Sequence, residues 1–177
     1  MQRRHVTSRR AFSLLETTVI VVIVGIVAAS ARPALRLLSD ARKINTAQEV
    51  ERNLLLARTL AMTTGRPTGV VLSTNEMRVV KIDQPGDAPS PVLGADGAPR
   101  GVLMLHEEQR DAWITLLRDG AGSTTTSATV WFDINGTPEL RDASGALLGP
   151  CVSDVNVYVA GVQAVTVRRV TGMVERR

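Results

Sequence analysis

The most constraining feature of the sequence is an uncharged, largely apolar run near its start, Thr17–Ala31 (TTVIVVIVGIVAASA). Extended back to Phe12, the run has 20 residues, about the length of a helix that crosses a bilayer core. Four arginines precede it within the first ten residues, and positive charge on that side predicts a cytoplasmic start. Glu16 is the one charged residue inside the run. Because a carboxylate there costs roughly 2.5–3.5 kcal/mol on insertion scales, Glu16 is a candidate functional residue.

Three interpretations of this segment compete. A secretory signal would be cleaved at the A-x-A sequence Ala29-Ser30-Ala31, and the sequence Ser8-Arg9-Arg10-Ala11-Phe12 is similar to a twin-arginine export signal. A plain signal anchor would keep the apolar run as a membrane helix. A prepilin-type signal would be cleaved before the run, so that the whole apolar helix stays in the mature protein.

The residues that favour the third interpretation are Phe12-Ser13-Leu14-Leu15-Glu16, Gly25–Ala29 and Pro33. Together they resemble the N-terminus of type IV pilins and of type II secretion pseudopilins. In that family the first mature residue is usually Phe, the fifth is Glu and the twenty-second is commonly Pro. Counted from Phe12, Glu16 is fifth and Pro33 is twenty-second. The sequence departs from the family at Ala11, where the family usually has Gly.

The resemblance implies a processing and assembly route. A prepilin peptidase would cleave between Ala11 and Phe12 and would methylate the new amine of Phe12. Glu16 would then pair with such an amine and set the register between neighbouring subunits, because pairing two charges in an apolar bundle lowers the desolvation cost of each. Pro33 would bend the helix rather than end it.

Beyond residue 33 an apolar stripe continues at helical spacing. Its members are Ala34, Leu37, Ala41, Ile44, Ala47, Val50, Leu54, Ala57 and Ala61. Gly65 and Pro67 follow the last of them and predict the end of the helix. The spacing therefore predicts an amphipathic helix over residues 34–64.

The remainder of the chain has the pattern of strands and turns. Gly69–Ser73 and Met77–Ile82 read as a hairpin, and Asp133–Gly136 as a turn between two strands. The proline-rich segment 83–100 and the segment 119–127 read as loops. The predicted fold class is α+β and pilin-like. It has a long N-terminal helix, transmembrane in its first half and amphipathic in its second, packed on an antiparallel β-sheet.

Two further segments narrow the resemblance. Leu54–Thr68 (LLLARTLAMTTGRPT) is similar to the helix end of GspH/FimT-type minor pseudopilins, and Val130–Pro138 (VWFDINGTP) is similar to a strand–turn signature of that subfamily. The Asn-Gly-Thr within the second segment also matches a glycosylation sequon, but Asn-Gly between two strands is the composition of a hairpin turn, which we favour.

Composition argues against an enzyme. The chain has one cysteine and two histidines, which leaves little for a metal site or a nucleophile–base pair. We therefore expect no catalytic residues, no metal and no cofactor. Aromatic residues make up 3% of the chain, too few for a platform on which nucleic-acid bases stack.

The distribution of charge allows one mode of nucleic-acid binding, through a local basic surface. Without the four leader arginines, basic and acidic residues balance at 17 each, so any basic surface must be local. Four arginines cluster near the C-terminus: Arg168, Arg169, Arg176 and Arg177. Some FimT-like minor pilins are associated with DNA uptake, and such a cluster could contact phosphates. A solvated strand edge, where charge prevents unwanted pairing, is the interpretation we favour.

The sequence thus predicts a basic prepilin leader at 1–11, a transmembrane and filament-core segment at 12–33, an amphipathic helix at 34–64 and a periplasmic β-rich domain at 65–177. The expected protein is a minor pilin or pseudopilin, a structural subunit of a type II secretion pseudopilus or type IV pilus. It would be a single-pass protein of the bacterial inner membrane, with prepilin peptidase and other pilin subunits as partners. The alternatives are a twin-arginine-exported binding domain released after Ala31, and a minor pilin that binds DNA through its C-terminal arginines.

Overall fold

The computed structural model describes the backbone of residues 14–74, 76–100, 103–104 and 114–177, and their side chains except at 30–36, 103, 104 and 163. The described chain begins with helix α1 (Leu14–Thr64) and continues in strands. It divides into two compact units, Met1–Leu38 and Ser39–Arg177.

The strands form two sheets, and every strand pair in them is antiparallel. The first sheet has the order β3-β2-β1-β7-β8-β9, with β4 also paired to β2. Its strands are β1 (Thr68–Ser73), β2 (Glu76–Lys81), β3 (Ser90–Pro91), β4 (Leu103–Met104), β7 (Ser127–Phe132), β8 (Pro138–Arg141) and β9 (Leu147–Pro150). The second sheet has the order β12-β11-β10-β5-β6. Its strands are β5 (Ile114–Arg118), β6 (Thr124–Thr125), β10 (Val155–Val159), β11 (Val162–Val167) and β12 (Val174–Arg176).

The predicted fold class is therefore wrong about the sheet: the chain builds two antiparallel sheets where one was expected. The reason is non-local pairing. Strand β1 pairs with β7, with Val70 opposite Val130, whereas β5 pairs with β10, with Leu117 opposite Val157. Consecutive segments of the chain thus alternate between the sheets, which no local pattern specifies.

The prediction of a single-pass inner-membrane protein is also wrong. Within the part of the chain that the structure describes, no helix combines the length and the apolar character needed to cross a membrane. The helical stretches with described side chains are 14–29 and 37–64. The stretch 37–64 carries many charges.

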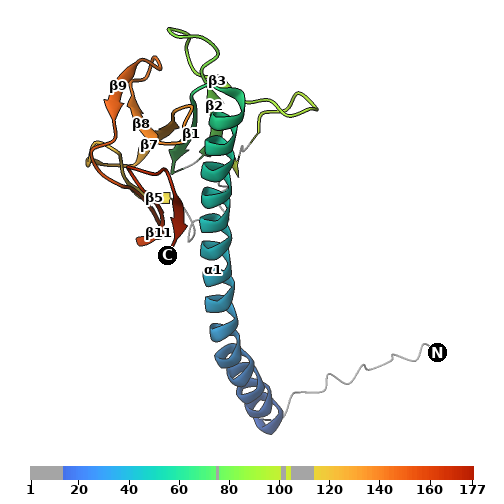
Figure 1. Ribbon diagram of the computed structural model, residues 1–177. Coiled ribbons are helices and arrows are strands. Elements are labelled where there is room, and N and C mark those ends of the chain that lie inside the picture. The colour runs from blue at the N-terminus through green and yellow to red at the C-terminus, as the bar shows by residue number, and fades with distance from the viewer. Residues whose placement is uncertain (1–13, 75, 101–102, 105–113) are drawn as a thin grey trace, which may run out of the picture. The chain divides into compact units, whose positions relative to one another are not determined.

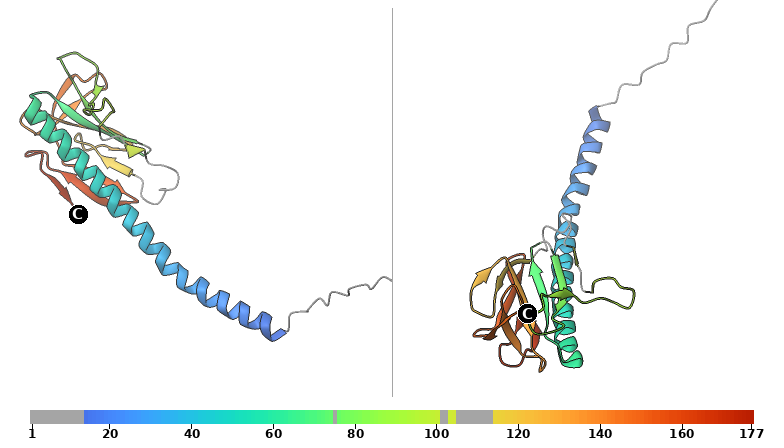
Figure 2. Two further views of the ribbon diagram at one scale, coloured as in Figure 1. Left: turned by 90° about the vertical axis from the view of Figure 1, so that its right-hand side faces the viewer. Right: turned by 90° about the horizontal axis from the view of Figure 1, so that it is seen from above.

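One face of the α1 segment in the second unit packs on both sheets (Figures 1 and 2). Its buried apolar residues are Ala47, Val50, Leu54, Ala57 and Ala61. They share one core with residues of both sheets, namely Val70, Leu72, Met77, Val79, Val130 and Phe132 from the first sheet and Ile114, Leu117, Val155, Val157, Val159, Ala164, Val165 and Val167 from the second. Three of these five apolar residues are alanines.

A second, smaller cluster lies in the first sheet, where Trp131 packs with Val80, Ile82 and Val71. Gly69 lies opposite Trp131 in the β1–β7 ladder. A Cβ at Gly69 would come within 2.8 Å of the indole ring, so this position needs glycine for the ring to lie flat on the strand.

The end of α1 is fixed locally. Gly65 has a positive φ of 65° and donates its N–H to the carbonyl of Ala61 at 3.1 Å. The hydroxyls of Thr63 and Thr64 donate to carbonyls of the preceding turn, at 2.8 and 2.7 Å. Pro67 then prevents the helix from continuing.

Arg58 joins the helix to turns that belong to the two different sheets. Its Nε donates to the carbonyl of Gly136, in the β7–β8 turn, and its Nη2 donates to the carbonyl of Thr171, in the β11–β12 connection, both at 3.1 Å. We call this arrangement the Arg58 bridge. At the same point Gly172 faces Gly136 so closely that a Cβ on Gly172 would lie 1.9 Å from the Gly136 carbonyl oxygen.

We predict that Gly172→Ala destabilises the domain by at least about 2 kcal/mol more than Gly161→Ala does, because overpacking against a rigid backbone adds to the φ penalty. The pair is matched: φ is +64° at Gly172 and +79° at Gly161, and a Cβ at Gly161 meets nothing within 4 Å. Urea unfolding of the full chain, followed by tryptophan fluorescence, measures both. Equal losses in the two variants would contradict this account of the contact.

Candidate functional site

The first candidate surface is the apolar helix segment Leu14–Ala29, in the first unit. Its ten large apolar side chains are all between 48 and 87% exposed: Leu14, Leu15, Val19, Ile20, Val21, Val22, Ile23, Val24, Ile26 and Val27. A helix that is apolar on every side is stable in a protein only where other surfaces cover it. The segment is therefore built to be buried by something outside its own unit.

Glu16 lies in the first turn of α1 and is exposed among these apolar side chains. A carboxylate at this position interacts favourably with the positive end of the helix dipole. The neighbouring Thr18 hydroxyl donates to the carbonyl of Leu14 at 2.8 Å, so it contributes little polarity to the surface.

The other residues of the predicted processing site are not placed. Ala11 and Phe12 lie outside the described residues. Pro33 lies within the backbone bounds of α1, and its side chain is not described. Cleavage at Ala11–Phe12, methylation of Phe12 and a bend at Pro33 stay predictions.

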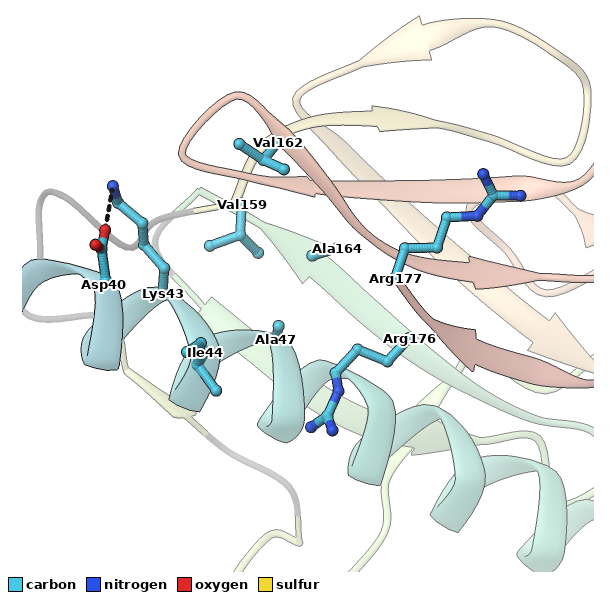
Figure 3. A pocket seen from close by; sticks show the side chains of 9 residues that line it. All are labelled: Asp40, Lys43, Ile44, Ala47, Val159, Val162, Ala164, Arg176 and Arg177. Carbon is cyan, nitrogen blue, oxygen red and sulfur yellow. Dashed lines mark hydrogen bonds and ion pairs between the residues drawn. The ribbon is translucent and has the colours of Figure 1, made fainter.

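The second candidate surface is a groove in the second unit, shown in Figure 3. One wall is the helix, with Ile44 and Ala47, and the other is the β10–β11 hairpin, with Val159, Val162 and Ala164. The groove has a volume of about 440 Å³. We call it the helix–hairpin groove. Ile44 is 54% and Val162 67% exposed, so its apolar walls face solvent.

Basic side chains line the edge of this groove. Lys43 lies 3.4 Å from Asp40, one turn earlier on the helix. Arg176 points towards the helix, where its Nη1 lies 3.7 Å from the Glu51 carboxylate (Figure 3). Arg177 donates its backbone N–H to Ala164, and within the described residues no carboxylate forms an ion pair with its guanidinium. In Figure 3 the Arg177 side chain extends away from the helix.

The four C-terminal arginines do not form one free basic patch. Arg168 binds two carboxylates, Glu175 through Nη2 at 2.8 Å and Asp154 through Nη1 at 3.1 Å. Arg169 donates from its backbone N–H to Asp154 at 2.9 Å and from its side chain to the carbonyl of Val152 at 2.9 Å. These contacts hold the β11–β12 edge to the loop before β10, which is a structural role.

These contacts shift two pKa values. The backbone N–H of Arg169, and then the Arg168 guanidinium, hold the pKa of Asp154 below its ordinary value. Hydrogen bonds from Arg168 to Glu175 and Asp154 raise the pKa of the guanidinium. Arg168 is thus a fixed cation with its charge already neutralised, which makes it a poor contact for phosphate.

The single cysteine is not a reactive group. Cys151 is buried against Gly120, where a Cβ would come within 2.2 Å of its sulfur. Burial, with smaller effects from Asp119 and Glu139, raises the pKa of this thiol to about 11. Among the described residues, no three His, Cys, Asp or Glu side chains are grouped so that they could hold a metal ion.

Sequence reasoning did not find the helix–hairpin groove or the Arg58 bridge. The groove combines residue 44 with residues 159–164 and 176–177, and no local pattern links segments so far apart. Arg58 lies within the segment Leu54–Thr68, whose resemblance to a helix end predicts no contact for its side chain. The one sequence signal for its role is the presence of glycine in both turns that it contacts.

Comparison with models of protein families, with curated proteins and with solved structures finds no match to this chain.

We predict that Asp154→Asn lowers the urea midpoint at pH 7 and that the difference from wild type disappears in acid. A carboxylate whose pKa is lowered on folding contributes stability above its unfolded value of about 4, and loses that contribution as pH falls through the folded value. Unfolding at a series of pH values from 7 to 2 measures it, with the exposed Asp87→Asn as control. A gap that persisted at pH 2 would contradict the assignment.

Proposed function

We propose that this chain is a minor pilin or pseudopilin, a structural subunit that joins a type II secretion pseudopilus or a type IV pilus. The observation that carries the proposal is the apolar helix segment Leu14–Ala29, whose large side chains are all exposed in the single chain. Its N-terminal sequence, with Phe12, Glu16 and Pro33 at the spacing of prepilin-type proteins, supports the same conclusion.

The energetics favour burial of this segment in a bundle of helices. Covering ten large, half-exposed apolar side chains contributes roughly 1 kcal/mol or more for each of them, about 10 kcal/mol in all. The cost of burying the Glu16 carboxylate is several kcal/mol if it is unpaired, and less if it meets a cation. Apolar burial therefore exceeds the cost of the charge. Pairing of Glu16 with the amine of Phe12 in a neighbouring subunit would turn that cost into a preference for one register.

Release of a domain after Ala31 would remove the Leu14–Ala29 segment. That alternative therefore gives the exposed apolar side chains of the segment no role in the mature protein. The DNA-binding alternative gains no support from the contacts of Arg168 and Arg169, which are engaged with Asp154, Glu175 and Val152. Assembly by helix packing is the function that accounts for both the exposed segment and its single carboxylate.

The proposal predicts the N-terminus of the mature protein. In cells that contain prepilin peptidase, the purified protein is expected to begin at Phe12 with one additional methyl group, because the apolar segment must be retained for assembly. Intact-mass measurement and N-terminal sequencing determine this directly. A protein that begins at Arg32 would overturn the proposal in favour of a cleaved export signal.

The proposal also predicts a requirement for Glu16. We expect Glu16→Ala and Glu16→Gln to lower incorporation into filaments at least tenfold, because both remove the charge that sets the register. The control is Glu49→Gln, a half-exposed carboxylate on the same helix but outside the apolar segment. The amount of the chain in sheared filament fractions, relative to the major subunit, is the measurement. Normal incorporation of Glu16→Ala beside wild-type partners would remove this role.

A further inference from the structure

One wall of the helix–hairpin groove is held in a strained backbone conformation. Val159 and Val162 are paired across the β10–β11 hairpin, which leaves Ala160 and Gly161 as its two-residue turn. Their φ values are 51° and 79°, and Ala160 is the one residue other than glycine with positive φ in the part of the chain that the structure describes. Such turns favour Asn or Gly, because a Cβ is strained at positive φ. The hairpin that carries Val162 is therefore maintained at a cost in stability.

A side chain of the neighbouring strand β5 fixes this turn. The Thr115 hydroxyl accepts a hydrogen bond from the N–H of Gly161 at 3.0 Å and donates one to the carbonyl of Tyr158 at 3.3 Å. The strained turn thus has one defined position, and Val162 follows it directly in the chain. Backbone strain of this kind is retained at functional sites, which points to the hairpin wall of the groove as a contact surface.

The groove is apolar and open. Its walls, Ile44 on the helix and Val162 on the hairpin, are 54 and 67% exposed, and the other apolar residues that line it are buried: Ala47, Val159 and Ala164 (Figure 3). A volume of about 440 Å³ is that of a pocket for a whole ligand, not of a gap for one side chain. An occupant must therefore present several apolar side chains together.

The charged residues at the edge of the groove favour an uncharged occupant. The ammonium of Lys43 and the guanidinium of Arg176 lie 3.4 and 3.7 Å from carboxylates of the same unit. The Arg177 side chain extends away from the helix (Figure 3). Recognition of a partner at this groove therefore depends on apolar contact rather than on an ion pair.

The Leu14–Ala29 segment is an apolar surface of this chain that needs cover on every side. Its ten large apolar side chains are all exposed. At 100° per residue, their directions leave no gap wider than about 80° around the helix axis. Helices packed in a bundle cover the sides that face one another. The sides that face away from the bundle axis need a different apolar surface.

We propose that the Leu14–Ala29 segment of one copy of this chain docks with one of its sides in the helix–hairpin groove of a second copy. The contact removes Ile44 and Val162 from water together with one side of the segment, which carries no charge after Glu16. Because the two surfaces differ and each copy carries both, the contact can repeat along a filament or a ring. This inference deepens the proposed function and rests on it, since it names a contact between the assembling helices and the β domain.

The test is cross-linking between two full-length chains that each carry one added cysteine. One chain carries Val162→Cys. The other carries Val22→Cys, Ile23→Cys or Val24→Cys, whose side chains point about 100° apart around the helix. The two chains, one of them tagged, are mixed in neutral detergent, the detergent is diluted and the mixture is mildly oxidised. We expect a disulfide-linked heterodimer, formed several-fold better by one helix position than by the other two, because one side of the helix lies in the groove.

The matched control replaces Val162→Cys by Val170→Cys. Val170 is a valine of the same unit with a similar exposed fraction, 70% against 67%, and it does not line the groove. Docking predicts a heterodimer yield roughly tenfold higher for Val162→Cys, whereas random collision gives equal yields. Equal yields from the two valine positions would overturn the inference, and so would equal yields from the three helix positions. The native Cys151 can remain in all chains, because it is buried.

A charge placed on the helix wall gives an independent test. Adding Ile44→Asp to the Val162→Cys chain should lower the heterodimer yield several-fold, because docking would bury an unpaired carboxylate. The control is Ile134→Asp, at an isoleucine that is 53% exposed, against 54% for Ile44, and lies outside the groove. Urea unfolding confirms that both variants are folded. An Ile44→Asp chain that cross-links as well as the Ile134→Asp chain would contradict docking in the groove.

Incorporation of the chain into filaments, measured as for Glu16, reports the proposed function separately. Normal incorporation together with equal yields from Val162→Cys and Val170→Cys would overturn the docking inference alone. A preferential heterodimer from a chain that never enters filaments would overturn the proposed function and leave the contact standing. Failure of both measurements would overturn both.

Discussion

In the β domain, the orientation of the helix relative to the two sheets is fixed by one charged side chain, which donates hydrogen bonds to two turns. Arg58 leaves the helix and donates to the carbonyls of Gly136 and Thr171, which belong to turns of the two different sheets. Hydrogen bonds from a charged donor are stronger than those between neutral groups. The Arg58 bridge therefore fixes the helix, the β7–β8 turn and the β11–β12 connection to one another, and it requires glycine at positions 136 and 172, where no Cβ fits.

The rest of the core follows from that arrangement. With one end of the helix fixed against both sheets, Val50 and Leu54 fill the space between the strands, and Ala57 and Ala61 keep the helix close to them. Apolar burial provides most of the stabilisation, but it is non-directional and would tolerate small rotations of the helix. The directional hydrogen bonds of Arg58 select one rotation. That rotation leaves Ile44 at the wall of the groove instead of in the core.

The sequence allowed prediction of the structural features that depend on residues close together in the chain. The hairpin of β1 and β2 and the turn at Asp133–Gly136 were recognisable because turn chemistry and alternation are local, and the structure has both. The division into two sheets could not be predicted, because it depends on pairs of residues that are far apart in the chain, such as Val70 and Val130. The arginine cluster could be recognised in the sequence. Whether its charges are free depends on the carboxylates of Asp154, Glu175 and Glu51, which form ion pairs with Arg168 and Arg176. The membrane-spanning helix was expected from the apolar run, the arginines before it and the resemblance to prepilin-type sequences, and the part of the chain that the structure describes does not support it.

The placement of these residues separates folding from assembly. The residues that stabilise the domain, such as Leu54, Phe132 and Arg58, are buried or half-buried, whereas Ile134, Val162 and the side chains of Leu14–Ala29 are exposed and contribute little to the fold. Under the proposed function, changes in the Leu14–Ala29 segment should alter assembly while the unfolding midpoint stays near that of the wild type, since surface substitutions usually change stability by less than about 0.5 kcal/mol. The core of the second unit contains none of the Leu14–Ala29 side chains, so the fold of that unit does not require them.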